Sequence, residues 1–266
     1  MWICPTAVAK EVLISDFEQL NSALEWGFDY AERNPWGIGF EEENADEIAK
    51  RIESAPLPVK TICGFIGDPE GRGLMVVGPD RDSKRLKEYV TGLFDRMQLV
   101  GVEVIGYGSG GSRWVPEGFD RDLALNQVVD FLQMCGEIGE SRSVITTLEP
   151  YNRDDANLLN TVPDACALVK KIDHPNVKLM ADFFHMKLNG ESFDELQDAG
   201  PYLAHAHIAE PGRGRPATYP SDHSDYLHAL RLAGYDGRVT MTGSLPAYNT
   251  PEEAALSLKT AAAAPL

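Results

Sequence analysis

The sequence predicts an α/β protein built as one (β/α)8 TIM barrel that spans residues 1–266. Strand-like and helix-like stretches alternate along the chain, and this alternation is typical of parallel strands joined by helices. The length of 266 residues is close to the roughly 250 residues of such barrels. No linker and no shift in composition divides the chain, so we expect a single domain with one large core.

Eight strand-and-helix units can be placed in order from apolar runs, helix caps and glycines. For example, Ser15 or Asp16 can begin the first helix, and Gly27 can end it. The expected strands are residues 2–8, 28–33, 59–66, 101–108, 143–150, 177–181, 202–210 and 237–244. The expected helices are residues 16–26, 45–54, 81–99, 120–139, 156–171, 191–198, 224–233 and 250–263.

Three loops are rich in glycine or proline. Residues 67–79 and 211–223 follow the third and seventh strands, and long loops of this kind in compact domains often border a binding pocket. The segment 108–114, GSGGSRW, could let the main chain approach a ligand, with Arg113 and Trp114 as candidate substrate contacts. A flexible turn explains the same glycines, because the segment matches no phosphate-binding motif.

Composition and charge narrow the class of partner. The chain has 41 acidic and 24 basic residues, a net charge of −17, which repels nucleic acid and anionic membranes. No apolar run approaches the ~18 residues of a membrane helix, and the first residues carry no basic signal region, so we expect a soluble cytoplasmic protein. The four cysteines are far apart and contain no CxxC pair, which favours free thiols over a zinc site.

Metal-capable side chains stand at the ends of three consecutive expected strands. Glu149 ends the fifth, Asp182 follows the apolar run of the sixth, and His207 lies near the end of the seventh. Asp182 alone could be a helix cap, since Asp is a preferred N-cap residue. The three together favour a barrel, whose active sites lie at the carboxyl ends of the strands, over an open sheet that binds ligands at its switch point.

Two carboxylates and one imidazole suit Mn²⁺, Mg²⁺ or Co²⁺ better than sulfur-loving metals. Such an ion acts as a Lewis acid and can stabilise the enediolate formed when a base removes a proton beside a carbonyl. His205 has the same strand parity as His207 but lies deeper, so we expect it in the barrel interior. His185 follows the sixth strand and could contact a substrate or orient a ligand.

Four segments resemble the strand-end motifs of the xylose isomerase-like TIM barrels, in particular sugar epimerases of the D-tagatose 3-epimerase type. The resemblance runs through roughly residues 100–245. Its motifs are LEPYNR (148–153), ADFFHM (181–186), HAHIAEPGR (205–213) and GYDGRV (234–239). It implies an enzyme that binds a divalent metal and acts on a small-molecule sugar. A homo-oligomer is compatible with the resemblance.

The resemblance also implies roles for individual residues. Glu149 would be both a metal ligand and the catalytic base, and Asp182 and His207 would be metal ligands. His185 and Arg213 would bind substrate hydroxyls or the carbonyl. Asp155 falls where the family has a glutamate that supports the site.

The chain departs from the resemblance at the end of the eighth strand. The family has a glutamate there, which is its fourth ligand and second base, whereas this chain has Thr242. A threonine hydroxyl cannot replace a general base, so a two-base epimerisation would lose one base. Three functions therefore remain open: a metal-dependent sugar isomerase or epimerase, a one-base lyase or dehydratase acting on an oxidised sugar, inositol or glycoside, and a catalytically silent sugar-binding homologue.

Overall fold

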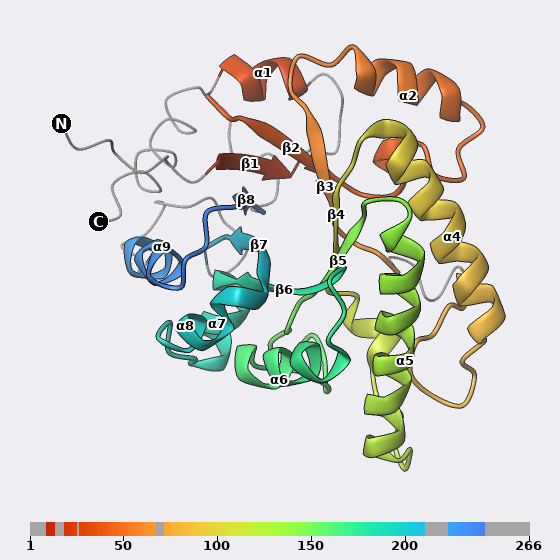
Figure 1. The fold of residues 1–266 in the computed structure, drawn as a ribbon, viewed down its shortest axis with the longest axis vertical. Coiled ribbons are helices and arrows are strands. Elements are labelled where there is room, and N and C mark those ends of the chain that lie inside the picture. Colours follow the sequence, from red (N-terminus) through yellow and green to blue (C-terminus); the bar gives the residue numbers. More distant parts are fainter. Residues whose placement is uncertain (1–8, 14–18, 26, 67–71, 211–222, 243–266) are drawn as a thin grey trace.

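Eight parallel strands close into a barrel in the computed structural model, and each strand pairs with its neighbours in chain order (Figure 1). The structure describes the chain except residues 1–8, 14–18, 26, 67–71, 211–222 and 243–266. The strands are β1 (Ala9–Leu13), β2 (Tyr30–Arg33), β3 (Val59–Ile62), β4 (Val104–Tyr107), β5 (Ile145–Leu148), β6 (Val177–Asp182), β7 (Leu203–Ile208) and β8 (Arg238–Met241). The expected barrel is confirmed.

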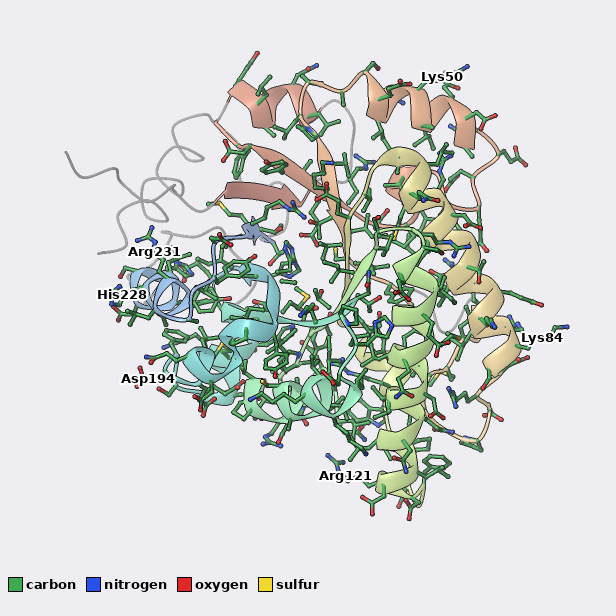
Figure 2. All side chains as sticks on the ribbon, viewed as in Figure 1. Lys50, Lys84, Arg121, Asp194, His228 and Arg231 are labelled. Atoms are coloured by element: carbon green, nitrogen blue, oxygen red, sulfur yellow. The ribbon has the colours of Figure 1, made fainter. Side chains whose placement is uncertain are left out.

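Helices surround the barrel, and charged side chains such as those of Lys50, Lys84 and Arg121 point away from it in Figure 2. The helices are α1 (Gln19–Glu25), α2 (Ala45–Glu53), α4 (Ser83–Val100), α5 (Arg121–Glu140), α6 (Val162–Ile172), α7 (Phe183–Asn189), α8 (Glu195–Ala199) and α9 (His223–Leu232). Short 3₁₀ helices are η1 (Trp36–Ile38), η2 (Gly110–Arg113) and η3 (Gly200–Tyr202). Among the described helices, none is long and apolar enough to span a membrane.

Local sequence signals account for where the two longest described helices begin and end. The Asp82 carboxylate accepts hydrogen bonds from the main-chain N–H groups of Lys84 and Arg85 and so caps α4. Asp120 caps α5 in the same way. Gly101 ends α4 with a φ of 74°, a left-handed conformation that glycine adopts without steric cost. These caps satisfy main-chain groups at the helix ends that would otherwise lack partners.

The space between the barrel and its two longest described helices is filled by aromatic rings. Phe65 stacks on Phe94 of α4 with a centroid distance of 5.7 Å and contacts Phe131 of α5 at 5.5 Å. Tyr107, at the end of β4, lies 5.0 Å from Phe131. Burial of such rings stabilises a fold by about 1.5–3 kcal/mol each, so this cluster fixes the outer side of the wall from which Glu149 projects.

Strand register brings the chemical residues to one level at the carboxyl end of the barrel. Asp182 pairs with His207 between β6 and β7, and His207 pairs with Thr240 between β7 and β8. Parallel neighbours that pair in register project their side chains to the same side of the sheet. Asp182, His207 and Thr240 therefore project to the same, inner side of the barrel wall.

The structure differs from the expected elements in three places. The predicted strand over 2–8 lies outside the described residues, and β1 is instead Ala9–Leu13, where Lys10 and Glu11 break the apolar run used to find strands. Helix α6 begins at Val162, not at 156, because Pro163 is tolerated only in a first turn and Thr161 supplies the cap. A further short helix, α7, follows β6 directly. The expected helix over 250–263 lies outside the described residues.

Candidate metal centre and active site

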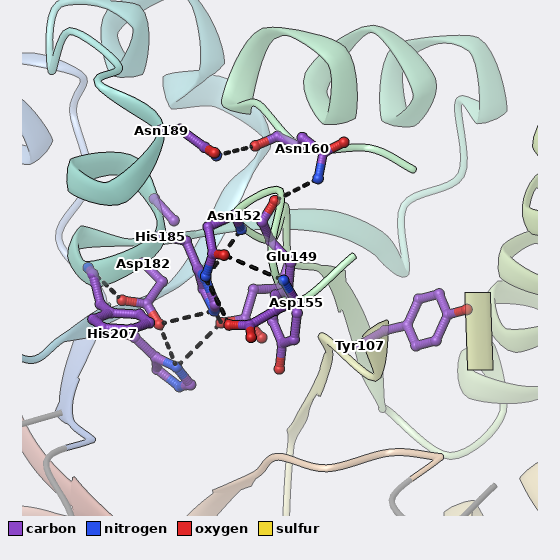
Figure 3. Close-up of polar contacts among 12 residues, drawn as sticks. Tyr107, Glu149, Asn152, Asp155, Asn160, Asp182, His185, Asn189 and His207 are labelled. Atoms are coloured by element: carbon purple, nitrogen blue, oxygen red, sulfur yellow. Dashed lines mark hydrogen bonds and ion pairs between the residues drawn. The ribbon is translucent and has the colours of Figure 1, made fainter. Parts of the chain in front are cut away.

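Glu149, Asp182 and His207 converge at the mouth of the barrel (Figure 3). Their potential ligand atoms all lie within 4.8 Å of one another, and all three residues are buried. His207 Nδ1 is 3.6 Å from Glu149 Oε1 and 3.9 Å from Asp182 Oδ2. These separations are longer than hydrogen bonds and slightly wider than the ~3 Å between neighbouring ligands on a small divalent ion. The trio therefore fits a divalent cation after a small inward movement.

Asp182 serves two purposes with its two oxygen atoms. Oδ1 accepts a hydrogen bond from the main-chain N–H of Phe184 at 2.8 Å and caps α7. Oδ2 faces the mouth, 3.7 Å from His185 Nε2 and 3.9 Å from His207 Nδ1. Asp182 is thus the helix cap that its sequence position allowed and also a member of the trio, and the cap fixes the direction of Oδ2.

The other ring nitrogen of His207 points into the barrel, toward Glu32 at the end of β2. His207 Nε2 lies 3.1 Å from Glu32 Oε1, and His205 Nε2 lies 3.1 Å from Glu32 Oε2. Thr240 Oγ1 is 3.1 Å from the same nitrogen of His205. A carboxylate behind a ligating histidine fixes the ring and its tautomer. Glu32 therefore directs His207 Nδ1 toward Glu149 and Asp182.

The electrostatic environment favours the charged forms of Glu32 and His207. Burial alone would raise the pKa of Glu32, but the His207 and His205 imidazoles hold that pKa well below its usual value. Burial alone would lower the pKa of His207, but the carboxylates of Glu32 and Glu149 hold it well above its usual value. Burial lowers the pKa of His205, although the neighbouring Glu32 carboxylate opposes this shift. The carboxylates around His207 thus favour a positive charge on this ring, next to Glu32.

His185 lies beside the trio with its tautomer defined. The main-chain N–H of Asn152 donates to His185 Nδ1 at 3.1 Å, so the proton of a neutral ring is on Nε2. Nε2 is 3.9 Å from Glu149 Oε1 and faces the mouth. The Asn152 side chain also donates to Asp155 Oδ2 at 2.7 Å, which places the half-exposed Asp155 at the same rim. His185 can therefore donate a hydrogen bond to a substrate oxygen.

A buried arginine, Arg113, hydrogen-bonds the main chain of Glu149. Arg113 is fully buried and donates to the main-chain oxygens of Glu149, at 2.6 Å, and of Tyr107, at 3.2 Å. Its guanidinium lies over the rings of Tyr107 and Tyr151. Arg113 thus lies behind the strand end with main-chain oxygens as partners, which differs from the substrate contact predicted from the sequence.

Gly108 explains part of the glycine-rich segment. A Cβ at this position would collide with Glu149 Oε2 and with the hydroxyl of Tyr151, whose ring stacks on His185 at 4.1 Å. Glycine here lets the main chain of the β4 end approach the carboxylate of Glu149. The following residues, Gly110–Arg113, form η2, so the segment is an ordered turn whose glycines permit close approach.

The remaining expected site residues lie outside the trio. Trp114 follows η2 and is 42% exposed, so its substrate contact stays a prediction. Glu210, another carboxylate near the seventh strand end, is buried with its Oε1 3.5 Å from His223 Nδ1. Arg213 and the 211–222 part of its loop lie outside the described residues. Within the other predicted loop, Val76 and Val77 donate to the main-chain oxygen of Ser112 and pack beside η2.

Sequence reasoning missed two residues, Glu32 and Asn152. Glu32 stands at the end of a strand, as the trio does, but the strand-end argument was applied only to the fifth, sixth and seventh strands. Asn152 follows Glu149 by three residues, and only the fold shows that its N–H meets His185. Applying the strand-end criterion to every strand would have found Glu32.

Comparisons with known proteins show the family of the chain. The family model of the xylose isomerase-like TIM barrels matches residues 20–260, and the chain belongs to this family. A D-psicose 3-epimerase of Ruminiclostridium cellulolyticum is 33% identical over 173 residues, which are 61% of this chain and 57% of that epimerase. The chain is thus aligned over little more than half the length of that relative.

Two further likenesses cover more of the chain. The 3-dehydro-D-guloside 4-epimerase of Escherichia coli is 27% identical over 215 residues, which are 77% of this chain and 79% of that protein. The crystal structure of the IolI protein, which has a bound zinc atom, superposes with a TM-score of 0.71 and 19% identity over 95% of this chain and 96% of that one. The second likeness shows the shared fold.

Proposed function

We propose that this protein is a divalent-metal-dependent sugar isomerase or epimerase that acts on a small polyhydroxy carbonyl compound through an enediolate. The observation that supports it best is the convergence of Glu149, Asp182 and His207 at the carboxyl ends of adjacent strands. Carboxylates are buried in a barrel at a cost unless they are paired or bind a cation. The names of the two relatives, both sugar epimerases, support the same class.

Each residue of the site has a role in this proposal. Mn²⁺, Mg²⁺ or Co²⁺, held by Glu149, Asp182 and His207, would supply Lewis-acid polarisation of a carbonyl. Glu149 would remove the proton from the carbon that bears the neighbouring hydroxyl. His185, with its proton on Nε2, would donate to a substrate oxygen. Asp155 and Asn152 would hold His185 at the rim.

Metal content and proton exchange test the proposal together. We expect about one divalent ion per chain, supplied in turn as Mn²⁺, Mg²⁺ or Co²⁺ to metal-free protein, and its loss in Glu149→Ala. In deuterated water, the loaded protein should introduce deuterium into a ketose such as D-fructose or D-tagatose. A protein that takes up none of the three ions would contradict the proposed function.

A one-base lyase or dehydratase on an oxidised sugar, inositol or glycoside is the second candidate. It is favoured by Thr242, because β8 is followed by a hydroxyl and not by a second carboxylate. Product analysis by NMR separates the two candidates, since a lyase forms an unsaturated product and an isomerase does not. A protein that binds metal and sugar without any proton exchange would instead be a silent sugar-binding homologue. The cytoplasmic location stays a prediction.

A further inference from the structure

Thr242, which follows β8, brings a hydroxyl group to the mouth of the barrel. Its main-chain N–H donates to Ile208 at 3.1 Å, so the pairing of β7 with β8 continues to this residue. Thr240 projects into the barrel, where its hydroxyl meets His205, and strand alternation turns Thr242 to the same side, nearer the mouth. Thr242 is 7% exposed, and its hydroxyl has no hydrogen-bond partner among the described residues. A buried polar group of this kind calls for a partner, which a ligand in the mouth can supply.

Glu149 and Thr242 approach the mouth from different sides. Glu149 follows β5 and Thr242 follows β8, with β6 and β7 between them along the barrel wall. Asp182 and His207, on those two intervening strands, supply the rest of the trio. A compound that lies over the trio therefore has a carboxylate on the β5 side and a neutral hydroxyl on the β8 side.

The other buried carboxylates near β7 and β8 are engaged by histidines. Both oxygens of Glu32 lie 3.1–3.2 Å from the Nε2 atoms of His205 and His207, and Glu210 lies beside His223. A neutral hydroxyl can donate or accept a hydrogen bond, but it cannot remove a proton from carbon at neutral pH without an adjacent base. Among the described side chains of the mouth, the two carboxylates of the trio, Glu149 and Asp182, thus face the substrate from the β5 and β6 side, away from Thr242.

We infer that Thr242 contacts the substrate and that proton transfer takes place on the Glu149 side alone, so that the reaction is a 1,2-isomerisation between an aldose and a ketose. This inference rests on the proposed function. Glu149 takes the proton from the hydroxyl-bearing carbon, whose C–H electrons form the enediolate double bond while the carbonyl electrons move to oxygen. The same carboxyl group returns a proton to the former carbonyl carbon on the same face. The hydroxyl proton moves to the other oxygen, so no oxidant or reductant is needed.

Two variants at position 242 test the substrate contact. Thr242→Val removes the hydroxyl with little change in volume, and Thr242→Ser keeps it. With Mn²⁺-loaded protein and D-fructose or D-tagatose as probes, calorimetry should show binding weakened about 5-fold in Thr242→Val and changed less than about 2-fold in Thr242→Ser. Mn²⁺ uptake and thermal unfolding should match in all three proteins. Equal sugar binding by wild type and Thr242→Val, or no binding of either ketose by the wild type, would overturn the contact.

The positions at which solvent deuterium enters the sugar test whether proton transfer takes place on one face only. In deuterated water, wild type should label one of the two hydrogen positions at C1 of the ketose and the C2 position of the aldose, without forming the C3 epimer. Formation of the C3 epimer would overturn the inference, because it requires a proton donor on the opposite face. Absence of label from a metal-loaded, sugar-binding protein would contradict the proposed chemistry as well, while the binding comparison would still decide whether Thr242 contacts the sugar.

Discussion

His207 joins two clusters that are built from the same residue types but differ in spacing. Toward the mouth, Nδ1 is 3.6 Å from Glu149 and 3.9 Å from Asp182. Toward the interior, Nε2 is 3.1 and 3.2 Å from the two oxygens of Glu32. The interior distances are those of hydrogen bonds, whereas the mouth distances leave room for a cation between the donors. Spacing therefore favours the mouth cluster as the proposed cation site and the interior cluster as its support.

Replacing Asp182 should have the largest effect, because it removes a ligand from the mouth cluster. Asp182→Asn should lower divalent-metal affinity by more than about 100-fold, beyond the 10 to 100-fold typical of a supporting residue. Asn is also a good N-cap, so the metal-free variant should unfold near the wild-type temperature. Metal titration followed by competition with a chelator measures the affinity.

Asp182→Ala is the matched control for the helix cap. It should lose the metal to the same extent and also destabilise the metal-free protein by about 1 kcal/mol, because α7 loses its cap. Wild-type metal affinity in Asp182→Asn would show that the mouth cluster is not the metal site.

Glu32→Gln should test the interior cluster with a smaller effect on the metal. The amide keeps the size of the side chain but removes the charge that orients His207, so metal affinity should fall about 10 to 100-fold. Thr240→Val is the control, since the Thr240 hydroxyl lies 3.1 Å from His205 Nε2, and it should change the affinity less than about 2-fold. Equal effects of the two variants would mean that Glu32 does not act through His207.

Thr242→Glu should add a fourth potential metal ligand to the mouth cluster. An additional carboxylate should tighten metal binding by about 10-fold, since loss of even a supporting partner typically costs 10 to 100-fold. It should also place a second base across from Glu149, so that C3 epimerisation of D-fructose or D-tagatose becomes detectable. Unchanged metal affinity would indicate that residue 242 does not face the trio.

Replacement of Glu191, which lies away from the mouth, should have the smallest effect. It should change the stability of the protein and not its metal binding. Burial raises the pKa of Glu191 to about 7, while its carboxylate accepts a hydrogen bond from Val162 at the start of α6. The folded protein thus holds this proton more tightly than the unfolded chain, whose carboxyl has a pKa near 4.5. The stabilisation is complete below about pH 4.5 and is lost as the pH rises to about 7.

Glu191→Gln should therefore be more stable than wild type at pH 8 by about 1 kcal/mol, a value kept small by solvent screening of a partly exposed group. The two proteins should differ less at pH 4.5, and thermal unfolding at both pH values measures the change. Glu137→Gln, at an exposed position of α5, serves as the control. A Glu191→Gln protein with the wild-type pH dependence would contradict the assignment.

The barrel and the trio could be predicted because both depend on periodicity along the chain. Alternation of strands and helices gives the fold, and strand ends give Glu149, Asp182 and His207. The local sequence does not tell which side chains meet across the barrel. Glu32 and His205 are 173 residues apart in the chain and meet only because the barrel closes. Arg113 looked like an anion partner because its sequence neighbours are glycines, whereas its actual partners are main-chain oxygens of β4 and of the residue after β5.

The close approach at Gly108 bears on how the protein can change during evolution. A methyl group at this position would collide with the carboxylate of Glu149, although Glu149, Asp182 and His207 would all be unchanged. A single-nucleotide change from glycine to alanine could thus silence the centre while the barrel core is retained. Homologues that keep all three ligands but lack glycine at this position should be examined as binding proteins before they are assigned an activity. Laboratory redesign of the pocket should leave residue 108 unchanged.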